Sequence, residues 1–327
     1  MQGIFGVLFL IIFAWLCSER RDQIDVRFLG IGLFAQLSLA FLFFQVPLIS
    51  DILMSLNFII AAIEAATLEG TRFLFGYLGG GSEPFEVSEG GYLYLFAFRV
   101  LPNVIVFCVL IAVLWYWKIL PKVVTGFGFL LRRVFQVSGA VGTSAAATLF
   151  LGMVETPMII RAYLTKLTRS EFFTVMTCGM STVAGSVMII YANTLSDIIP
   201  GAIGHIVVGS VLNIVGAIYV SRIIVPEDSS PTSSDKFEDL GYSSTMDAIT
   251  RGTQDGLKLA LNIGGMLLVI ISLVALVNGV LGLLEISDEP LSLQRMLGWL
   301  FSPLAWLIGV PWSEAHLAGN LMGSKIV

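Results

Sequence analysis

The stretch LFLGMVETPMIIRAYL, residues 149–164, places a glycine, a carboxylate and a proline between two apolar runs. Lipid penalises an ionised side chain, and proline interrupts a helix. A broken helix is tolerated at membrane depth only where protein or a water-filled cavity surrounds it. The fold therefore depends on whether this stretch lies in a membrane and on where the neighbouring apolar runs begin and end.

Composition places the chain in a membrane. Its 327 residues are 56% hydrophobic and 13% charged, and the mean hydropathy is +0.90. A bilayer crossing needs about 20 apolar residues, and its backbone must bond within a helix. We therefore expect an all-α, polytopic membrane protein. Apolar stretches of sufficient length cover 26–48, 92–120, 171–192, 202–225 and 256–284, and the shorter run 3–16 is interpreted as a first span.

Several protein classes are disfavoured by the polar residues. The net charge is −5 and the basic residues are scattered, so no nucleic-acid partner is expected. Cys17, Cys108 and Cys178 lie far apart, and His205 and His316 have no companion at a metal-ligand spacing. The pattern also offers no nucleophile with a base for an intramembrane enzyme. We expect neither an enzyme nor a bound cofactor.

Charged residues in the loops predict an orientation. Lys and Arg follow the run 3–16, follow the span 92–120 and precede the span 171–192, whereas the loops 76–91, 193–202 and 284–292 contain neither. Positive loops stay in the cytoplasm, which predicts a multi-pass protein with its N-terminus outside. We expect it in the plasma membrane, the bacterial inner membrane. Two apolar segments interrupted by charges, 50–79 and 121–137, are interpreted as interfacial helices.

The opening stretch lies within a segment, 139–167, whose two ends are both predicted on the cytoplasmic side. It must enter the membrane, turn and return. Gly152 permits unusual dihedrals, and Pro157 suits the first turn of the returning helix, which places Glu155 near a helix N-terminus that favours an anion. Such half-helix ends hold substrates and ions in secondary transporters.

A second interrupted segment, 291–323, is predicted to enter from the opposite side, with two apolar arms around Ser302 and Pro303. Two oppositely oriented re-entrant hairpins indicate an inverted repeat. The predicted organisation begins with scaffold spans and interfacial helices in 1–137, followed by a first transport-core repeat, a hairpin and two helices, in 138–225. An acidic cytoplasmic linker with an interfacial helix covers 226–254, and a scaffold span covers 255–286. A second core repeat begins in 287–327.

Other functions fit parts of this pattern. A passive channel also uses re-entrant hairpins with polar tips. A cation-coupled transporter of another small solute and a non-catalytic subunit of a larger complex are further alternatives. Accumulation of a solute against its gradient would separate a symporter from a channel.

Five stretches resemble the concentrative nucleoside transporter family, the cation-coupled nucleoside symporters. They are FAFRVLPNVIVFCVL (96–110), LFLGMVETPMIIRAYL (149–164), LTRSEFFTVMTCGMSTVAGSVM (167–188), GWLFSPLAWLIGVPW (298–312) and LAGNLMGSKIV (317–327). The resemblance implies secondary active symport of nucleosides into the cell, driven by a sodium or proton gradient. It also implies a homotrimer in the lipid bilayer.

The resemblance assigns substrate contacts. The family's tip motif Gly-Gln-Thr/Ser-Glu falls on Gly152, Met153, Val154 and Glu155, and an apolar position beside the base falls on Val187. The glycine and the acid are kept, whereas the two polar base contacts are replaced. Family members that favour purine nucleosides also carry Met at the Gln position, so the resemblance implies a purine preference.

The resemblance also assigns a candidate sodium site, to Thr148, Leu151, Thr182 and Val183, the last two in the unwound part of the next helix. Thr148 replaces the family's Asn, which leaves sodium and proton coupling both open. The family's Gly-x-Lys-x-x-x-Asn-Glu motif, whose Glu grips the ribose, begins in 323–327 and runs past the last residue. We therefore expect a C-terminally truncated chain, which does not transport by itself.

Overall fold

The computed structural model describes residues 2–45, 62–82, 84–85, 95–151, 156, 160–195, 198–199, 202–228, 232, 240–283, 285–286 and 289–326. They are mostly helical, which confirms the predicted all-α class. A short antiparallel pair, β1 (Glu285–Ile286) and β2 (Glu289–Pro290), is an exception. The chain divides into two compact units, a larger one over Ser18–Leu261 and a smaller one formed by Met1–Cys17 and Asn262–Val327.

Four candidate membrane spans occur in the described part of the chain. They match predicted stretches in α2 (Val26–Gln45), α4 with α5 (Phe96–Arg99 and Leu101–Tyr116), α11 (Ala202–Ile224) and α12 (Thr245–Leu281). The first predicted span forms the shorter apolar helix α1 (Gln2–Leu16). Many apolar side chains of α1, α2 and α12 are exposed, as a lipid-facing surface requires.

The apolar stretch 171–192 forms two helices rather than one. The first is α9 (Arg169–Ser181), and the second is α10 (Gly185–Leu195). Thr182 between them has extended backbone, with φ −109° and ψ 160°. The break falls at Thr182 and Val183, where the family resemblance places an unwound segment.

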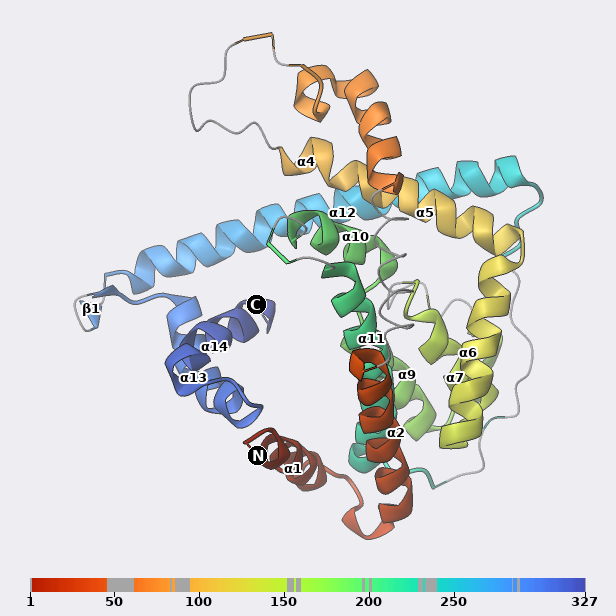
Figure 1. Cartoon of the computed structure of the whole chain (residues 1–327), viewed down its shortest axis with the longest axis vertical. Coiled ribbons are helices and arrows are strands. Elements are labelled where there is room, and N and C mark those ends of the chain that lie inside the picture. Colours follow the sequence, from red (N-terminus) through yellow and green to blue (C-terminus); the bar gives the residue numbers. More distant parts are fainter. Residues whose placement is uncertain are drawn as a thin grey trace. The chain divides into compact units, whose positions relative to one another are not determined.

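In the larger unit, α11 is the central helix. It packs against α2, α9 and α10, and Figure 1 shows α2 running beside it. A second layer pairs α6 (Ile119–Phe135) with α7 (Gly139–Ala147), and α7 in turn packs against α9. Short 3-10 turns lie at η1 (Arg21–Gln23), η2 (Gly76–Gly79) and η3 (Arg161–Lys166), and 62–75 is helical.

The sequence of α6 explains its packing. Leu120, Val124, Leu131 and Phe135 recur every three to four residues with Gly128, and all five are buried. The basic pair Arg132 and Arg133 lies in its last turn, where positive charge complements the helix C-terminus. This is the amphipathic helix predicted for 121–137, and its position in an interface stays a prediction.

In the smaller unit, α13 (Leu293–Leu307) and α14 (Trp312–Ile326) form a helical hairpin. The prediction that its arms turn around Ser302 and Pro303 is wrong, because α13 continues through both residues. A proline removes one backbone donor, and a helix can absorb that loss inside a protein. The turn comes later, where Gly309 adopts a φ of +117°, a conformation that side chains disfavour.

Small residues bring α13 and α14 into close contact. Ala315, Gly319 and Gly323 recur every four residues along α14 and are buried. A Cβ atom at Gly319 would lie 2.6 Å from the carbonyl oxygen of Gly298 and 2.9 Å from the backbone nitrogen of Ser302. Small-xxx-small stripes of this kind let helix backbones approach each other in membranes.

We predict that Gly319→Val destabilises the protein by about 1–3 kcal/mol, because the added side chain meets backbone atoms that cannot move aside cheaply. Gly279→Val is the matched control, since that helical glycine of α12 has no atom within 4 Å of an added Cβ. Thermal unfolding of the purified protein in detergent measures both. Equal unfolding temperatures for the two variants would contradict close packing between α13 and α14.

Candidate cation and substrate site

The site begins with α7, whose sequence GAVGTSAAA consists mostly of very small residues. All of them except Thr143 are buried. Ser138 caps the helix, its hydroxyl accepting from the backbone N–H of Val141 at 3.4 Å. Gly128 of α6 and Gly142 of α7 pack so closely that a Cβ at Gly142 would lie 2.9 Å from the carbonyl oxygen of Gly128. Small side chains thus allow a short helix to be buried on nearly all sides.

α9 begins with a complete capping box. The Thr168 hydroxyl accepts from the backbone N–H of Glu171, and the Glu171 carboxylate accepts from the backbone N–H of Thr168. Glu171 is 1% exposed and also accepts from the backbone N–H and hydroxyl of Thr232. These bonds fix the start of the helix that carries the break.

The break between α9 and α10 is stabilised by two side chains of α11. The amide of Asn213 donates to the carbonyl of Ser181, the last residue of α9, at 2.9 Å. The Ser210 hydroxyl lies 3.5 Å from the backbone nitrogen of Val183. Backbone groups freed by a broken helix need such partners in a membrane, so α11 takes part in forming the break. Gly185 lets α10 begin close to the backbone of Phe150, because a Cβ atom at this position would lie only 2.8 Å from the Phe150 carbonyl oxygen.

Thr148 and Thr182 come together at this break. The Thr182 hydroxyl lies 3.1 Å from the carbonyl oxygen of Cys178 and 3.5 Å from that of Thr148, and it can donate to either. The Thr148 hydroxyl donates to the carbonyl of Ala145 at 2.7 Å, and Thr148 is 1% exposed. Two residues that are 34 positions apart thus place hydroxyl and carbonyl oxygens in one small volume.

The electrostatics of this cluster suit a cation. α7 and α9 both end here, and a helix C-terminus carries partial negative charge from its unpaired carbonyls. The Ser144 hydroxyl, one turn before Thr148, is buried and has no hydrogen-bond partner in the part of the chain that the structure describes. Neutral oxygens at half-helix ends are the ligands that transporters use for sodium.

The other residues assigned from the sequence have different surroundings. Leu151 is 8% exposed and packs with Trp115, Ala146 and Ala147. Val183 packs against Met188 and Ile203. Val187 is half-buried in α10. Gly152, Met153, Val154 and Glu155 lie outside the described residues.

Sequence reasoning missed Ser210, Asn213 and Ser144. The first two are polar residues three positions apart inside the apolar stretch 202–225. Polar residues inside a span usually bond to a partner or serve the function, so this pair could have indicated a site. Ser144 gave no comparable signal, since a serine among alanines is ordinary.

Apolar helices of spanning length, together with a broken helix that gathers uncharged oxygens, define a membrane transporter of the secondary class. Three family models agree. One described as Na+ dependent nucleoside transporter N-terminus matches residues 5–78, one described as nucleoside recognition matches 97–197, and one described as Na+ dependent nucleoside transporter C-terminus matches 205–327.

Similar proteins lead to the same family. The chain is 35% identical to the nucleoside permease NupC of Helicobacter pylori, over 99% of the chain and 76% of NupC. It is 34% identical to the uncharacterized transporter YutK of Bacillus subtilis, over 100% of the chain and 79% of YutK. The solved structure of CNTnw in an inward-facing, substrate-bound state matches with a TM-score of 0.87 and 35% identity, over 99% of the chain and 77% of CNTnw. The chain belongs to the concentrative, Na+-dependent nucleoside transporter family, and it is a transporter rather than an enzyme.

We predict that Thr182→Val raises the half-saturating sodium concentration of the purified protein about tenfold, because valine keeps the shape but removes an oxygen ligand. Sodium that binds the folded state raises the unfolding temperature, so a titration of that temperature with sodium, against potassium, reports binding.

Thr177→Val is the matched control on the same helix, since its hydroxyl donates to its own helix, to the carbonyl of Phe173 at 2.7 Å. The same sodium titration for both variants would contradict a cation site at Thr182.

Proposed function

We propose that the protein carries out secondary active symport of nucleosides into the cell, across the plasma membrane, which is the bacterial inner membrane; its similarity to bacterial transporters supports this location. The observation that carries this proposal is the oxygen cluster of Thr148 and Thr182, at the ends of two helices in one bundle. Family membership supplies the solute class. The family resemblance further supports a homotrimer, and the distribution of Lys and Arg among the loops supports an N-terminus outside the cell.

Sodium is the coupling ion that we favour. The described cluster consists of hydroxyl and carbonyl oxygens, and such neutral, hard ligands hold an alkali cation without needing to change protonation. The matching family models are described as Na+ dependent. Proton coupling is the second candidate, because the carboxyl of Glu155, at the predicted hairpin tip, is a group that could carry the proton.

Substrate binding is assigned to the hairpin tip and to the helix after the break. Gly152 and Glu155 keep the family's residues, so Glu155 is proposed to accept hydrogen bonds from the nucleobase. Met153 and Val154 replace two polar base contacts, and Val187 of α10 adds an apolar wall. A hairpin tip that makes fewer hydrogen bonds to the base distinguishes nucleosides less by their donors and acceptors and more by the shape of the base.

We predict that vesicles containing the full-length protein accumulate labelled adenosine above the outside concentration under an inward sodium gradient. Glu155→Gln lowers this uptake about tenfold or more, because a charged acceptor at the base is replaced by a neutral one. A pH gradient imposed alone tests the proton alternative.

Glu69→Gln is the control, since that carboxylate is exposed and paired with Arg72 of the next turn. Facilitated uptake that only equilibrates, with neither gradient driving accumulation, would favour the channel and contradict symport. Uptake by Glu155→Gln equal to that of Glu69→Gln would contradict the assigned role of Glu155.

We also predict that adenosine or inosine is taken up at least as well as uridine, because methionine is unbranched and adapts to a larger ring. The double variant Met153→Gln, Val154→Thr restores two polar groups at the tip and should shift preference toward uridine. Competition of labelled adenosine uptake by unlabelled uridine measures the shift. An unchanged inhibition profile would show that selectivity is determined elsewhere.

A further inference from the structure

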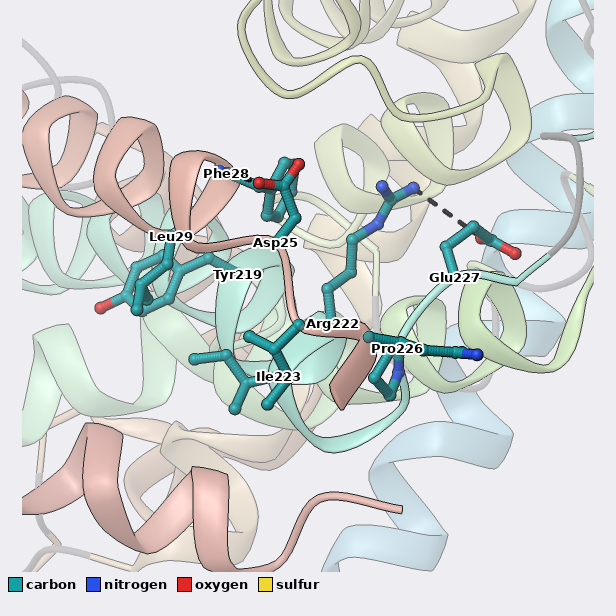
Figure 2. Close-up of a pocket in the computed structure, with 10 residues that line it drawn as sticks. Asp25, Phe28, Leu29, Tyr219, Arg222, Ile223, Pro226 and Glu227 are labelled. Carbon is teal, nitrogen blue, oxygen red and sulfur yellow. Dashed lines mark hydrogen bonds and ion pairs between the residues drawn. The ribbon is translucent and has the colours of Figure 1, made fainter. Parts of the chain in front are cut away.

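A cavity of about 150 Å³ lies between the start of α2 and the end of α11, on the larger unit and away from the break. Figure 2 shows Asp25 and Phe28 on one side and Arg222 and Glu227 on the other. The cavity is lined by both polar and apolar groups, with Leu29 and Ile223 among the latter. The proposed symport makes no use of it.

Arg222 is the central group of this cavity. Its side chain is 17% exposed, and its nearest carboxylate oxygen, Glu227 Oε2, is 3.8 Å away, which is beyond hydrogen-bond distance. The guanidinium carbon lies 5.0 Å from the centroid of the Phe28 ring. Across the described residues this guanidinium makes no hydrogen bond, although it has five donors. The guanidinium forms a long ion pair with Glu227, and because Arg222 lines the cavity, an acceptor placed there can reach its donors.

Three carboxylates act on that guanidinium, those of Glu227, Glu171 and Asp25, and the Glu171 carboxylate is already bonded to Thr168 and Thr232. Glu227 Oε2 accepts from the Thr168 hydroxyl at 3.1 Å, while Glu227 Oε1 is buried with no hydrogen-bond partner in the described structure. Asp25 caps α2, with Oδ1 accepting from the backbone N–H groups of Arg27 at 2.9 Å and Phe28 at 3.2 Å. A simple anion would be attracted by one cation and repelled by three carboxylates, whereas a zwitterion would match both signs.

The place of the cavity indicates where such a zwitterion comes from. It lies at the first residues of one candidate span, Val26–Phe43, and at the last residues of another, Ala202–Ile224. The ends of spanning helices lie at the level of the lipid headgroups. Large apolar side chains continue along α2 from this end, and Val26 and Phe34 are 75% and 74% exposed, as contacts for acyl chains require.

We propose that this cavity binds the headgroup of a phosphatidylethanolamine, with the phosphate on Arg222 and the ammonium on Glu227 and Asp25. The primary ammonium donates three hydrogen bonds, and the carboxylate groups of Glu227 and Asp25, which line the cavity, are its acceptors. A choline headgroup has no N–H to donate, and a glycerol headgroup has no positive charge. The charges of these residues therefore select phosphatidylethanolamine over phosphatidylcholine and phosphatidylglycerol.

The test is native mass spectrometry of the purified protein, after incubation with equal amounts of the three phospholipids. Phosphatidylethanolamine should be retained in preference, and Arg222→Gln should reduce its retention about tenfold, as loss of a charge-assisted hydrogen bond predicts. Arg20→Gln is the matched control. Arg20 is an exposed neighbour that pairs with Asp228 at 2.9 Å and does not line the cavity, so the variant should retain the lipid.

A second variant keeps the proposal testable if Arg222→Gln does not fold. Asp25→Asn with Glu227→Gln preserves the helix cap, because asparagine caps as well as aspartate, and it removes both negative charges. It should bind phospholipid but no longer prefer ethanolamine over choline. Equal retention of the three lipids by the parent protein would overturn the proposal, as would equal effects of Arg222→Gln and Arg20→Gln. Displacement of the lipid by soluble phosphoethanolamine or inorganic phosphate at millimolar concentration would overturn it too, showing a site for soluble ligands.

Discussion

The hydrogen bonds from α11 to the break between α9 and α10 are the interaction on which the candidate site depends. A helix that unwinds among apolar neighbours releases backbone groups that lipid cannot satisfy. Asn213 bonds the carbonyl at the end of α9, and Ser210 lies at the backbone nitrogen that follows. With those groups satisfied, the carbonyls and hydroxyls around Thr182 can face the end of α7. The short α7 reaches that position because its small side chains need little space.

Much of the fold could be predicted from hydrophobic length alone. The apolar runs at 26–48 and 202–225 became α2 and α11 with boundaries that differ by a few residues. The stretch 171–192 shows what length misses, because hydropathy does not register a break that tertiary partners stabilise. Its position followed from the family resemblance, and its cause, two polar residues on another helix, is a long-range contact that no local pattern contains.

Proline was a poor guide to the turn in the smaller unit. Pro303 suggested a turn because it lacks a backbone donor, but α13 passes through it and ends at Leu307. The chain turns where Gly309 adopts positive φ and where Pro311 precedes α14. One lost hydrogen bond costs less than the packing that the continuous helix gains along the stripe of small residues on α14. Side-chain volume on the partner helix therefore decided the outcome, and the residues that carry it, Ala315, Gly319 and Gly323, lie 12 to 20 positions after Pro303.

The Thr182 hydroxyl has one proton and two carbonyl acceptors within reach, those of Cys178 and Thr148. If an ion binds the carbonyl oxygen of Thr148, the Thr182 hydroxyl can still donate to the carbonyl oxygen of Cys178 and direct its lone pairs toward the ion. Neither a rotamer change nor a backbone movement is then required, and no protein hydrogen bond is left broken. The proposed cation site is preorganised in the thermodynamic sense: its oxygens are already held in place by folding, so an ion binding there would spend little of its binding free energy on ordering them.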